Sequence, residues 1–185
     1  MSTKTLKLND ICPDFNLKSV NGKYYSLKSF EDKKALIIIF SCNHCPYVQA
    51  YEERIKAIQN DYASKGVQVV AINSNDETQY EDDSFEGMIK RARERIFNFP
   101  YLRDEDQSVA ISFDASHTPE IFLFDENRRL KYHGKIDDNW KDEENVRSFY
   151  LREALNELLE GKEISVPETF SIGCTIKWKP KNIAL

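Results

Sequence analysis

Two cysteines separated by two residues stand where a strand is expected to give way to a helix. Cys42 and Cys45 follow the apolar run 35–40, whose length and β-branched residues predict a buried strand. Pro46 and the helical spacing after it predict that a helix begins at once. A thiolate at a helix N-terminus faces unpaired backbone N–H groups and the positive end of the helix dipole, which lower its pKa. The pattern therefore predicts one nucleophilic thiol and a second thiol close enough to form a disulfide with it.

Thiol–disulfide exchange needs an attacking thiolate and a resolving thiol. We expect Cys42 to attack, because it comes first in the turn and can be exposed, and Cys45 to resolve, because the first helical turn covers it. His44 lies between them and can carry a positive charge, so we expect it to favour the Cys42 thiolate and a more oxidising site. Zinc binding or two inert thiols are the competing interpretations. Zinc commonly takes four ligands, however, and the chain has no second C-x-x-C and no matching pair of histidines.

The elements expected around the cysteines read as a βαβ unit with an arm before it and a tail after it. Asn21–Gly22 is typical of a two-residue hairpin turn, so residues 1–30 are predicted to form an N-terminal hairpin arm. Apolar residues spaced by three and four after Tyr47 predict a helix, and the run 67–72 predicts a strand parallel to the first. The remaining predictions are a helix over 84–97, a short helix over 107–113, strands over 120–124 and 130–134, a helix over 145–160 and a tail over 162–185.

Composition limits the class of protein. The 185 residues fit one domain over 1–185, 41% of them are apolar, and the net charge of -5 gives no basic footprint for nucleic acid. No window approaches the length of a membrane span, and the first residues lack the apolar region of a secretory signal, so we expect a cytoplasmic protein. Four cysteines are too few for a disulfide-stapled scaffold of this length. No metal or organic cofactor is expected.

A second candidate site element is Thr118–Pro119, just before a predicted strand. Together with the C-x-x-C-Pro at a helix start and the C-terminal helix, it resembles the thioredoxin fold. The hairpin arm and the helical insert are similar to the redoxin branch, which holds the alkyl hydroperoxide reductase/thiol-specific antioxidant family. The chain resembles most a group of uncharacterised thioredoxin-like redoxins in these segments: Cys42-Asn43-His44-Cys45-Pro46, Ile72-Asn73-Ser74-Asn75-Asp76, Phe99-Pro100-Tyr101-Leu102-Arg103-Asp104, Thr118-Pro119-Glu120, Gly134-Lys135-Ile136-Asp137-Asp138-Asn139 and Gly173-Cys174-Thr175-Ile176-Lys177-Trp178.

The resemblance implies an α/β fold with a central mixed sheet flanked by helices. It also implies that Cys42 and Cys45 are the redox pair, that Pro119 is a cis proline, and that Thr118 and Pro119 bind the substrate. An X-Pro bond is the one peptide bond that adopts cis at modest cost. A cis proline here would place backbone N–H and C=O groups beside the cysteines for an extended partner peptide.

The chain also departs from better-known members of this fold. Ser41 stands where tryptophan is common, and the strand before the motif has no buried acid. A proton carrier for Cys45 would have to come from elsewhere, with Asp76 and Asp82 of the insert as candidates. The peroxidase pattern Pro-x-x-x-Thr/Ser-x-x-Cys-Pro retains only Cys45–Pro46. Its Thr/Ser position holds Cys42, and its first proline position holds Ile38.

Two cysteines remain outside the motif. Cys174 becomes a third redox thiol if the tail folds back over the C-x-x-C, and is otherwise a small buried residue. Cys12 in the arm is expected to be structural. Trp178 and Phe170 are expected to pin the tail by burial.

These observations favour an enzyme, a thiol–disulfide oxidoreductase in which Cys42 attacks and Cys45 releases the product. Its partners would be protein or small-molecule disulfides and dithiols, with another dithiol protein as electron donor. Two alternatives stay open. One is an antioxidant hydroperoxide reductase that acts through a sulfenic acid. The other is a Cu(I) carrier that uses the cysteines with His117 or His133, since soft thiolates suit Cu(I).

Overall fold

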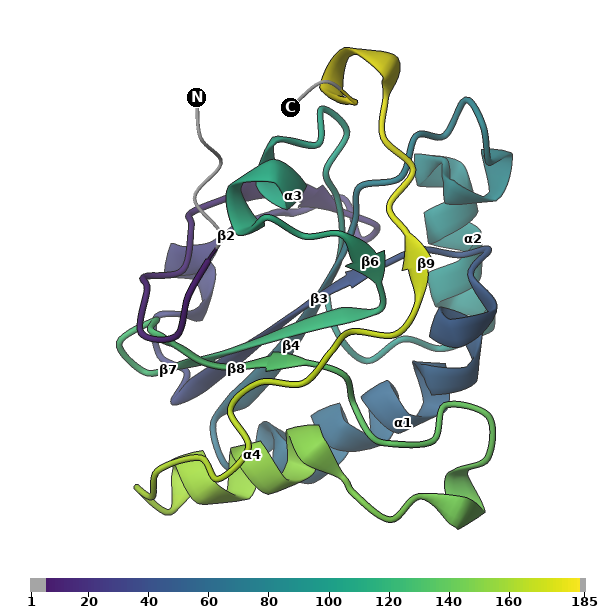
Figure 1. The fold of residues 1–185 in the computed structure, drawn as a ribbon. Coiled ribbons are helices and arrows are strands. Elements are labelled where there is room, and N and C mark those ends of the chain that lie inside the picture. The colour runs from purple at the N-terminus through teal and green to yellow at the C-terminus, as the bar shows by residue number, and fades with distance from the viewer. Residues whose placement is uncertain (1–5, 184–185) are drawn as a thin grey trace.

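The computed structural model describes residues 6–183, which form a mixed sheet covered by helices on both faces (Figure 1). The strands are β1 (Asn16–Ser19), β2 (Tyr24–Ser26), β3 (Ala35–Ser41), β4 (Val67–Asn73), β5 (Tyr101–Arg103), β6 (His117–Thr118), β7 (Glu120–Asp125), β8 (Leu130–Gly134) and β9 (Cys174–Thr175). The α-helices are α1 (Pro46–Ala63), α2 (Phe85–Glu94), α3 (Ser108–Phe113) and α4 (Tyr150–Leu159). Short 3-10 helices are η1 (Leu27–Phe30), η2 (Glu81–Asp83), η3 (Glu143–Asn145) and η4 (Pro180–Asn182).

Seven strands form the main sheet in the order β2-β1-β5-β4-β3-β7-β8. β3 pairs with β4 in parallel and with β7 antiparallel, and β4 pairs in parallel with β5. The crossover through α1 between β3 and β4 is the predicted βαβ unit. The central mixed sheet flanked by helices is therefore confirmed. A separate two-stranded ribbon joins β6 to β9 near the end of β3.

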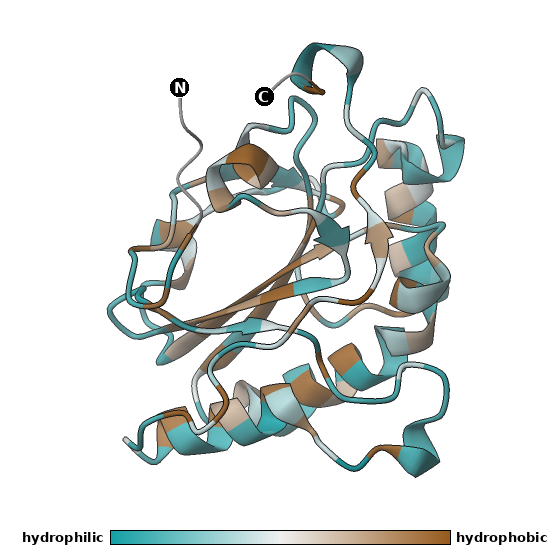
Figure 2. Cartoon of the chain, viewed as in Figure 1, coloured by the Kyte–Doolittle hydropathy of each residue, from teal (hydrophilic) through white to brown (hydrophobic). Residues whose placement is uncertain are grey.

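The strand β3 is buried on both faces, which explains why its sequence is continuously apolar. Ala35, Ile37 and Ile39 pack in one core cluster with residues of α1 and α4. The alternate residues, including Leu36 and Phe40, pack in a second cluster on the α3 side. Hydrophobic residues accordingly run along the central strands in Figure 2. The end of β3 that precedes Cys42 is therefore fixed by side-chain packing on both faces of the sheet.

The N-terminal arm is part of this sheet. β1 and β2 form the predicted hairpin, and Gly22 adopts φ 83°, the left-handed conformation that glycine tolerates best. β1 also pairs antiparallel with β5, so the arm extends the sheet beyond β5. The expected arm began at residue 1, and its first five residues lie outside the described part of the chain. Within residues 6–183, no helix has both the length and the apolar character that crossing a bilayer requires.

Two predicted helix boundaries are wrong. The helix predicted over 145–160 begins at Tyr150, because Asp138 holds the segment before the helix in a non-helical conformation. The carboxylate of Asp138 accepts a hydrogen bond from Arg147 N (3.0 Å), and the N–H of Asp138 donates one to Ser148 O (3.1 Å). Phe149 is 43% exposed and does not belong to the apolar face of the helix. The helix predicted over 84–97 ends at Glu94, two residues before Ile96 adopts a positive φ of 54°.

The tail beyond α4 folds back across the molecule to the site. Its strand β9 lies beside β6, with Thr118 opposite Cys174 and His117 opposite Thr175 (yellow beside green in Figure 1). Ile176 fixes it by burial, at 3% exposure, and Trp178 packs against the same core cluster while partly exposed. The expectation for Phe170 is wrong, because its side chain is 93% exposed.

Candidate active site

The strand–helix junction holds the two cysteines as predicted. Cys42 directly follows β3, Cys45 is the N-cap residue of α1, and Pro46 is the first helical residue. The missing N–H of Pro46 costs nothing at that position, because the first helical N–H groups have no partner within the helix. The 18-residue helix α1 therefore directs the positive end of its dipole at Cys45.

The Thr118–Pro119 bond is cis, as the resemblance implies, and Thr118 contacts both sulfurs. Cys42 Sγ lies 3.3 Å from Thr118 Oγ1, and Cys45 Sγ lies 3.3 Å from Thr118 O. The cis-proline segment and the C-x-x-C are thus one site, although 73 residues or more separate them in the chain.

Both cysteines of the motif are buried, which contradicts the expectation that Cys42 is exposed. Cys42 is 1% exposed and Cys45 is 0% exposed. They form a small apolar cluster with Val48, and two partly buried residues, Tyr47 and Cys174, pack against it. Cys174 belongs to the tail strand β9, so this strand lies against the two buried cysteines.

The third cysteine lies in this cluster. The Cys174 sulfur is 2.8 Å from the Cys45 sulfur, and Cys174 is partly exposed. All three thiols are free in this structure. The fourth cysteine, Cys12, belongs to a different core cluster, the one on the α3 side of the sheet, where burial raises its pKa.

The pKa values of Cys42 and Cys45 are shifted in opposite directions. The neighbouring thiol of Cys42 and, to a smaller extent, that of Cys174 lower the pKa of Cys45 to about 4, against the opposing effect of burial. The pKa of Cys42 is raised because its thiol donates to Cys45, because it is buried, and because Asp83 is close. These directions favour Cys45 as the thiolate, whereas the sequence analysis expected Cys42 to attack.

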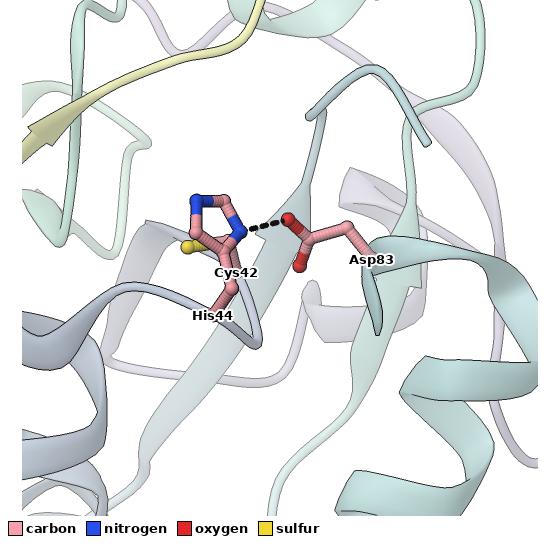
Figure 3. Close-up of side chains that lie close together, drawn as sticks. All are labelled: Cys42, His44 and Asp83. Atoms are coloured by element: carbon pink, nitrogen blue, oxygen red, sulfur yellow. Dashed lines mark hydrogen bonds and ion pairs between the residues drawn. The ribbon is translucent and has the colours of Figure 1, made fainter. Parts of the chain in front are cut away.

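His44 does not supply an unbalanced positive charge to Cys42. Its Nδ1 lies 2.5 Å from Asp83 Oδ2, and its ring stacks on Tyr80 with centroids 3.9 Å apart. Figure 3 shows the imidazole bonded to this carboxylate beside Cys42. The negative charge of Asp83 raises the pKa of Cys42, which is opposite to the expected effect of His44. The ionisable neighbours of Cys42 on this side are therefore the paired His44 and Asp83.

Asp83 is the site residue that sequence reasoning missed. It is completely buried, and its carboxylate accepts from Asn43 N (2.6 Å), Asn73 Nδ2 (3.1 Å) and Asn75 Nδ2 (2.9 Å). Asp76 and Asp82, the acids expected as candidate proton carriers for Cys45, do not occupy this buried position. Asp76 binds Thr78 and Gln79 of its own loop, and Asp82 is exposed, with its backbone oxygen accepting from Asn43. The sequence feature that could have indicated Asp83 is Ser84, the residue after it. Ser84 is the N-cap of α2 and accepts from Gly87 N, so the carboxylate of Asp83 is not needed as the cap and can face the site.

The histidines proposed for a Cu(I) site do not join the cysteines. His133 binds Glu120 at 2.7 Å, and His117 binds Ser116 at 2.7 Å. Among residues 6–183, one group of three ligand-type side chains has all its ligand atoms within 4.8 Å of one another, and it consists of Cys42, His44 and Asp83. The Asp83 carboxylate already accepts hydrogen bonds from three amide groups, so little of its capacity remains for a metal ion.

Comparisons with known proteins agree with this geometry. The redoxin family model matches residues 7–149. A solved structure of an uncharacterized conserved protein from Geobacillus kaustophilus is 41% identical, with a TM-score of 0.90, and the match covers 96% of this chain and 95% of that one. No curated protein matches the chain at the level of sequence.

More distant solved structures share the thioredoxin-like fold. The thioredoxin domain of a thiol-disulfide oxidoreductase from Bacteroides vulgatus is 18% identical, with a TM-score of 0.59, and covers 68% of this chain and 86% of its own. A peroxidoxin from Mycobacterium tuberculosis is also 18% identical, with a TM-score of 0.59, and covers 84% and 95%. At this identity the two likenesses show the fold alone.

Proposed function

Because the chain belongs to the redoxin family, we propose that it is a thiol–disulfide oxidoreductase that exchanges disulfides through Cys42 and Cys45. The observation that supports this most is the placing of the two thiols together at the N-terminus of α1, where both contact Thr118 and the pKa of Cys45 is lowered to about 4. A thiolate that persists at neutral pH, with a thiol in contact with it, is the pair that exchange requires.

The reaction follows from these roles. The Cys45 thiolate attacks one sulfur of a substrate disulfide, a mixed disulfide forms, and the other substrate sulfur leaves as a thiolate. The Cys42 thiol then attacks Cys45 Sγ, forms the Cys42–Cys45 disulfide and releases the second substrate sulfur, which takes up the proton of Cys42. Two electrons pass from the protein to the substrate, and a dithiol protein returns them. The reverse sequence oxidises a dithiol.

Equilibration against glutathione redox buffers tests the proposal. The wild-type protein should form a reversible Cys42–Cys45 disulfide, identified by mass spectrometry of peptides from the alkylated protein. Cys42→Ser and Cys45→Ser should each abolish this disulfide and turnover of a protein disulfide substrate. Cys12→Ala is the matched control, because Cys12 lies in a different core cluster. A wild-type protein that keeps Cys42 and Cys45 reduced in oxidised glutathione contradicts the proposal.

A hydroperoxide reductase activity is the second candidate, and the low pKa of Cys45 beside Pro46 favours it. The Cys45 thiolate would attack a peroxide oxygen, give a sulfenic acid and release an alcohol or water. The Cys42 thiol would then condense with the sulfenic acid and expel water, which gives the same disulfide. Loss of peroxide in stoichiometric proportion to reduced Cys45, measured in single-cysteine variants, would favour this activity over exchange.

A further inference from the structure

We propose that Cys174 is a third catalytic thiol, which receives the disulfide from Cys42–Cys45 and exchanges it with partners at the surface. The inference rests on the proposed function and adds a route to it. Cys42 and Cys45 are sealed from solvent, whereas Cys174 contacts Cys45 and is partly exposed. A partner can therefore reach Cys174 in the conformation that covers the other two sulfurs.

The geometry suits a bond between Cys45 and Cys174. Their sulfurs are 2.8 Å apart, so an approach of about 0.8 Å reaches the ~2.05 Å of a disulfide. The pairing of β6 with β9 sets this approach, because it places Cys174 directly opposite Thr118, and Thr118 contacts Cys42 and Cys45. Gly173 allows the pairing, since a Cβ at that position would lie 2.1 Å from Thr118 O.

The tail is held at both ends, so Cys174 is a fixed part of the site. Before β9, Thr169 N donates to His133 O (2.9 Å) and Lys135 N donates to Thr169 Oγ1 (2.9 Å). After β9, Ile176 is buried, and Lys177 O accepts from Asp76 N (2.8 Å) and from Gln107 Nε2 (2.9 Å). Opening the tail would break these contacts together. Exchange through Cys174 leaves them intact.

The chemistry balances in three steps, starting from the Cys42–Cys45 disulfide. First, the Cys174 thiolate attacks Cys45 Sγ, the Cys45–Cys174 bond forms, and Cys42 leaves and takes the proton that Cys174 lost. Second, a partner thiolate attacks the partly exposed Cys174 sulfur, and Cys45 leaves as a thiolate. Third, the second thiol of the partner attacks the partner sulfur joined to Cys174, closes the partner disulfide and releases Cys174. Two electrons pass from the partner dithiol to the protein.

The charges of the site support this order. In the reduced protein, burial and the Cys45 sulfur raise the pKa of Cys174 to about 11. The effect of a Cys45 thiolate disappears once Cys45 is part of a disulfide, so the oxidised protein is the state in which Cys174 ionises more readily. In the second step Cys45 is the favoured leaving group, because a thiol of low pKa leaves faster.

Trapping a mixed disulfide tests whether a partner reacts first at Cys174. We expect oxidised glutathione to react with reduced Cys45→Ser at Cys174, where the adduct persists because Cys45 cannot resolve it. Peptide mass spectrometry locates the adduct, and circular dichroism checks the fold. The double variant Cys45→Ser/Cys174→Ser is the control and should carry no adduct at Cys42. An adduct on Cys42, or a folded Cys45→Ser protein without an adduct on Cys174, overturns the proposal.

Reduction kinetics separate this inference from the proposed function. In oxidised Cys174→Ser, dithiothreitol should reduce the Cys42–Cys45 disulfide at least about tenfold more slowly, because attack then requires local opening of a buried site. Thr175→Ala on the same strand is the matched control and should react at the wild-type rate. An unchanged rate in Cys174→Ser overturns the relay but leaves exchange through Cys42 and Cys45 standing. A wild-type protein that forms no Cys42–Cys45 disulfide overturns both.

Discussion

The sulfur of Cys45 lies 2.8 Å from the sulfur of Cys174, although 129 residues separate the two in the chain. Cys45 also shares a buried cluster with Cys42, so it has a thiol neighbour on each of two segments. The site is therefore a triad of thiols in which the pKa of the central member, Cys45, is lowered. One outer member is buried beside Asp83, and the other is partly exposed on the tail.

Removal of Cys42 should transfer the disulfide to the tail. With Cys42→Ser, mild oxidation should give an intramolecular Cys45–Cys174 disulfide, because these sulfurs are already in contact. Non-reducing peptide mapping identifies the bond. Cys45→Ser should form no intramolecular disulfide within the triad, because the central sulfur is missing. A Cys42→Ser protein that remains fully reduced, or that only forms dimers, contradicts the triad.

The pH dependence of exchange should follow Cys45. Its pKa of about 4 means that Cys45 is a thiolate at neutral pH, so activity should fall as the pH drops through about 4 and the thiolate takes up a proton. Cys42→Ala removes the hydrogen bond that lowers this pKa most, so the midpoint should rise toward the ordinary value near 9. The ultraviolet absorbance of the thiolate, followed against pH in the reduced proteins, gives the pKa of Cys45 in the wild type and in Cys42→Ala. Cys12→Ala should leave the midpoint unchanged, and a midpoint insensitive to Cys42→Ala would count against the assignment.

The carboxylate of Asp83 should support both stability and tuning. Asp83→Ala leaves buried donors of Asn43, Asn73 and Asn75 without their acceptor, and we expect a loss of roughly 3 kcal/mol in the free energy of unfolding. Asp83→Asn keeps the shape but removes the negative charge, so the pKa of Cys42 should fall. Denaturant unfolding measures the loss of stability, and a pH titration of the alkylation rate of Cys42 measures its pKa.

The neighbouring acid supplies the control for these variants. Asp82→Ala should change stability by no more than about 0.5 kcal/mol, because the side chain is exposed and only its backbone oxygen contacts Asn43. Equal losses in Asp82→Ala and Asp83→Ala would show that the buried network is not specific to Asp83.

Local patterns in the sequence predicted the scaffold of the site well. The apolar run before Cys42 and the three–four spacing after Pro46 each depend on a few neighbouring residues, and both elements form at those places. The cis bond of Pro119 was predicted from the family resemblance, because an X-Pro sequence alone favours trans. These features placed the thiols on a strand–helix junction beside the cis proline.

Features set by contacts between distant segments were not predictable in this way. Three acids in succession, Glu81, Asp82 and Asp83, look alike in sequence, and only the turn η2 directs Asp83 inward. The tail that brings Cys174 against the two buried cysteines has a strand of only two residues, which carries no periodic signal. The exposure of the two cysteines, and with it the assignment of the thiolate, was therefore beyond local reasoning.

A methyl group on Gly173 should separate the tail from the cis-proline segment. The added Cβ would lie 2.1 Å from Thr118 O, a backbone atom that cannot rotate away. Gly173→Ala should therefore weaken the β6–β9 pairing and slow formation of the Cys45–Cys174 disulfide in a Cys42→Ser background, measured by quenched alkylation over time. Thr175→Ala adds no volume on the same exposed strand and serves as control. An unchanged rate in Gly173→Ala would mean that the pairing does not set the approach of the sulfurs.

Graded loosening of the tail should distinguish a relay from a cover. Ile176 is buried two residues after Cys174, so Ile176→Val should cost about 1 kcal/mol and Ile176→Ala about 3 kcal/mol, much of it from weaker docking of the tail. If Cys174 carries the disulfide to the surface, reduction of the oxidised protein by dithiothreitol should slow from wild type to valine to alanine. If the tail merely covers Cys42 and Cys45, the same series should react progressively faster. The two mechanisms therefore predict opposite trends in one measurement, and the alanine variant is interpreted only where its circular dichroism matches that of the wild type.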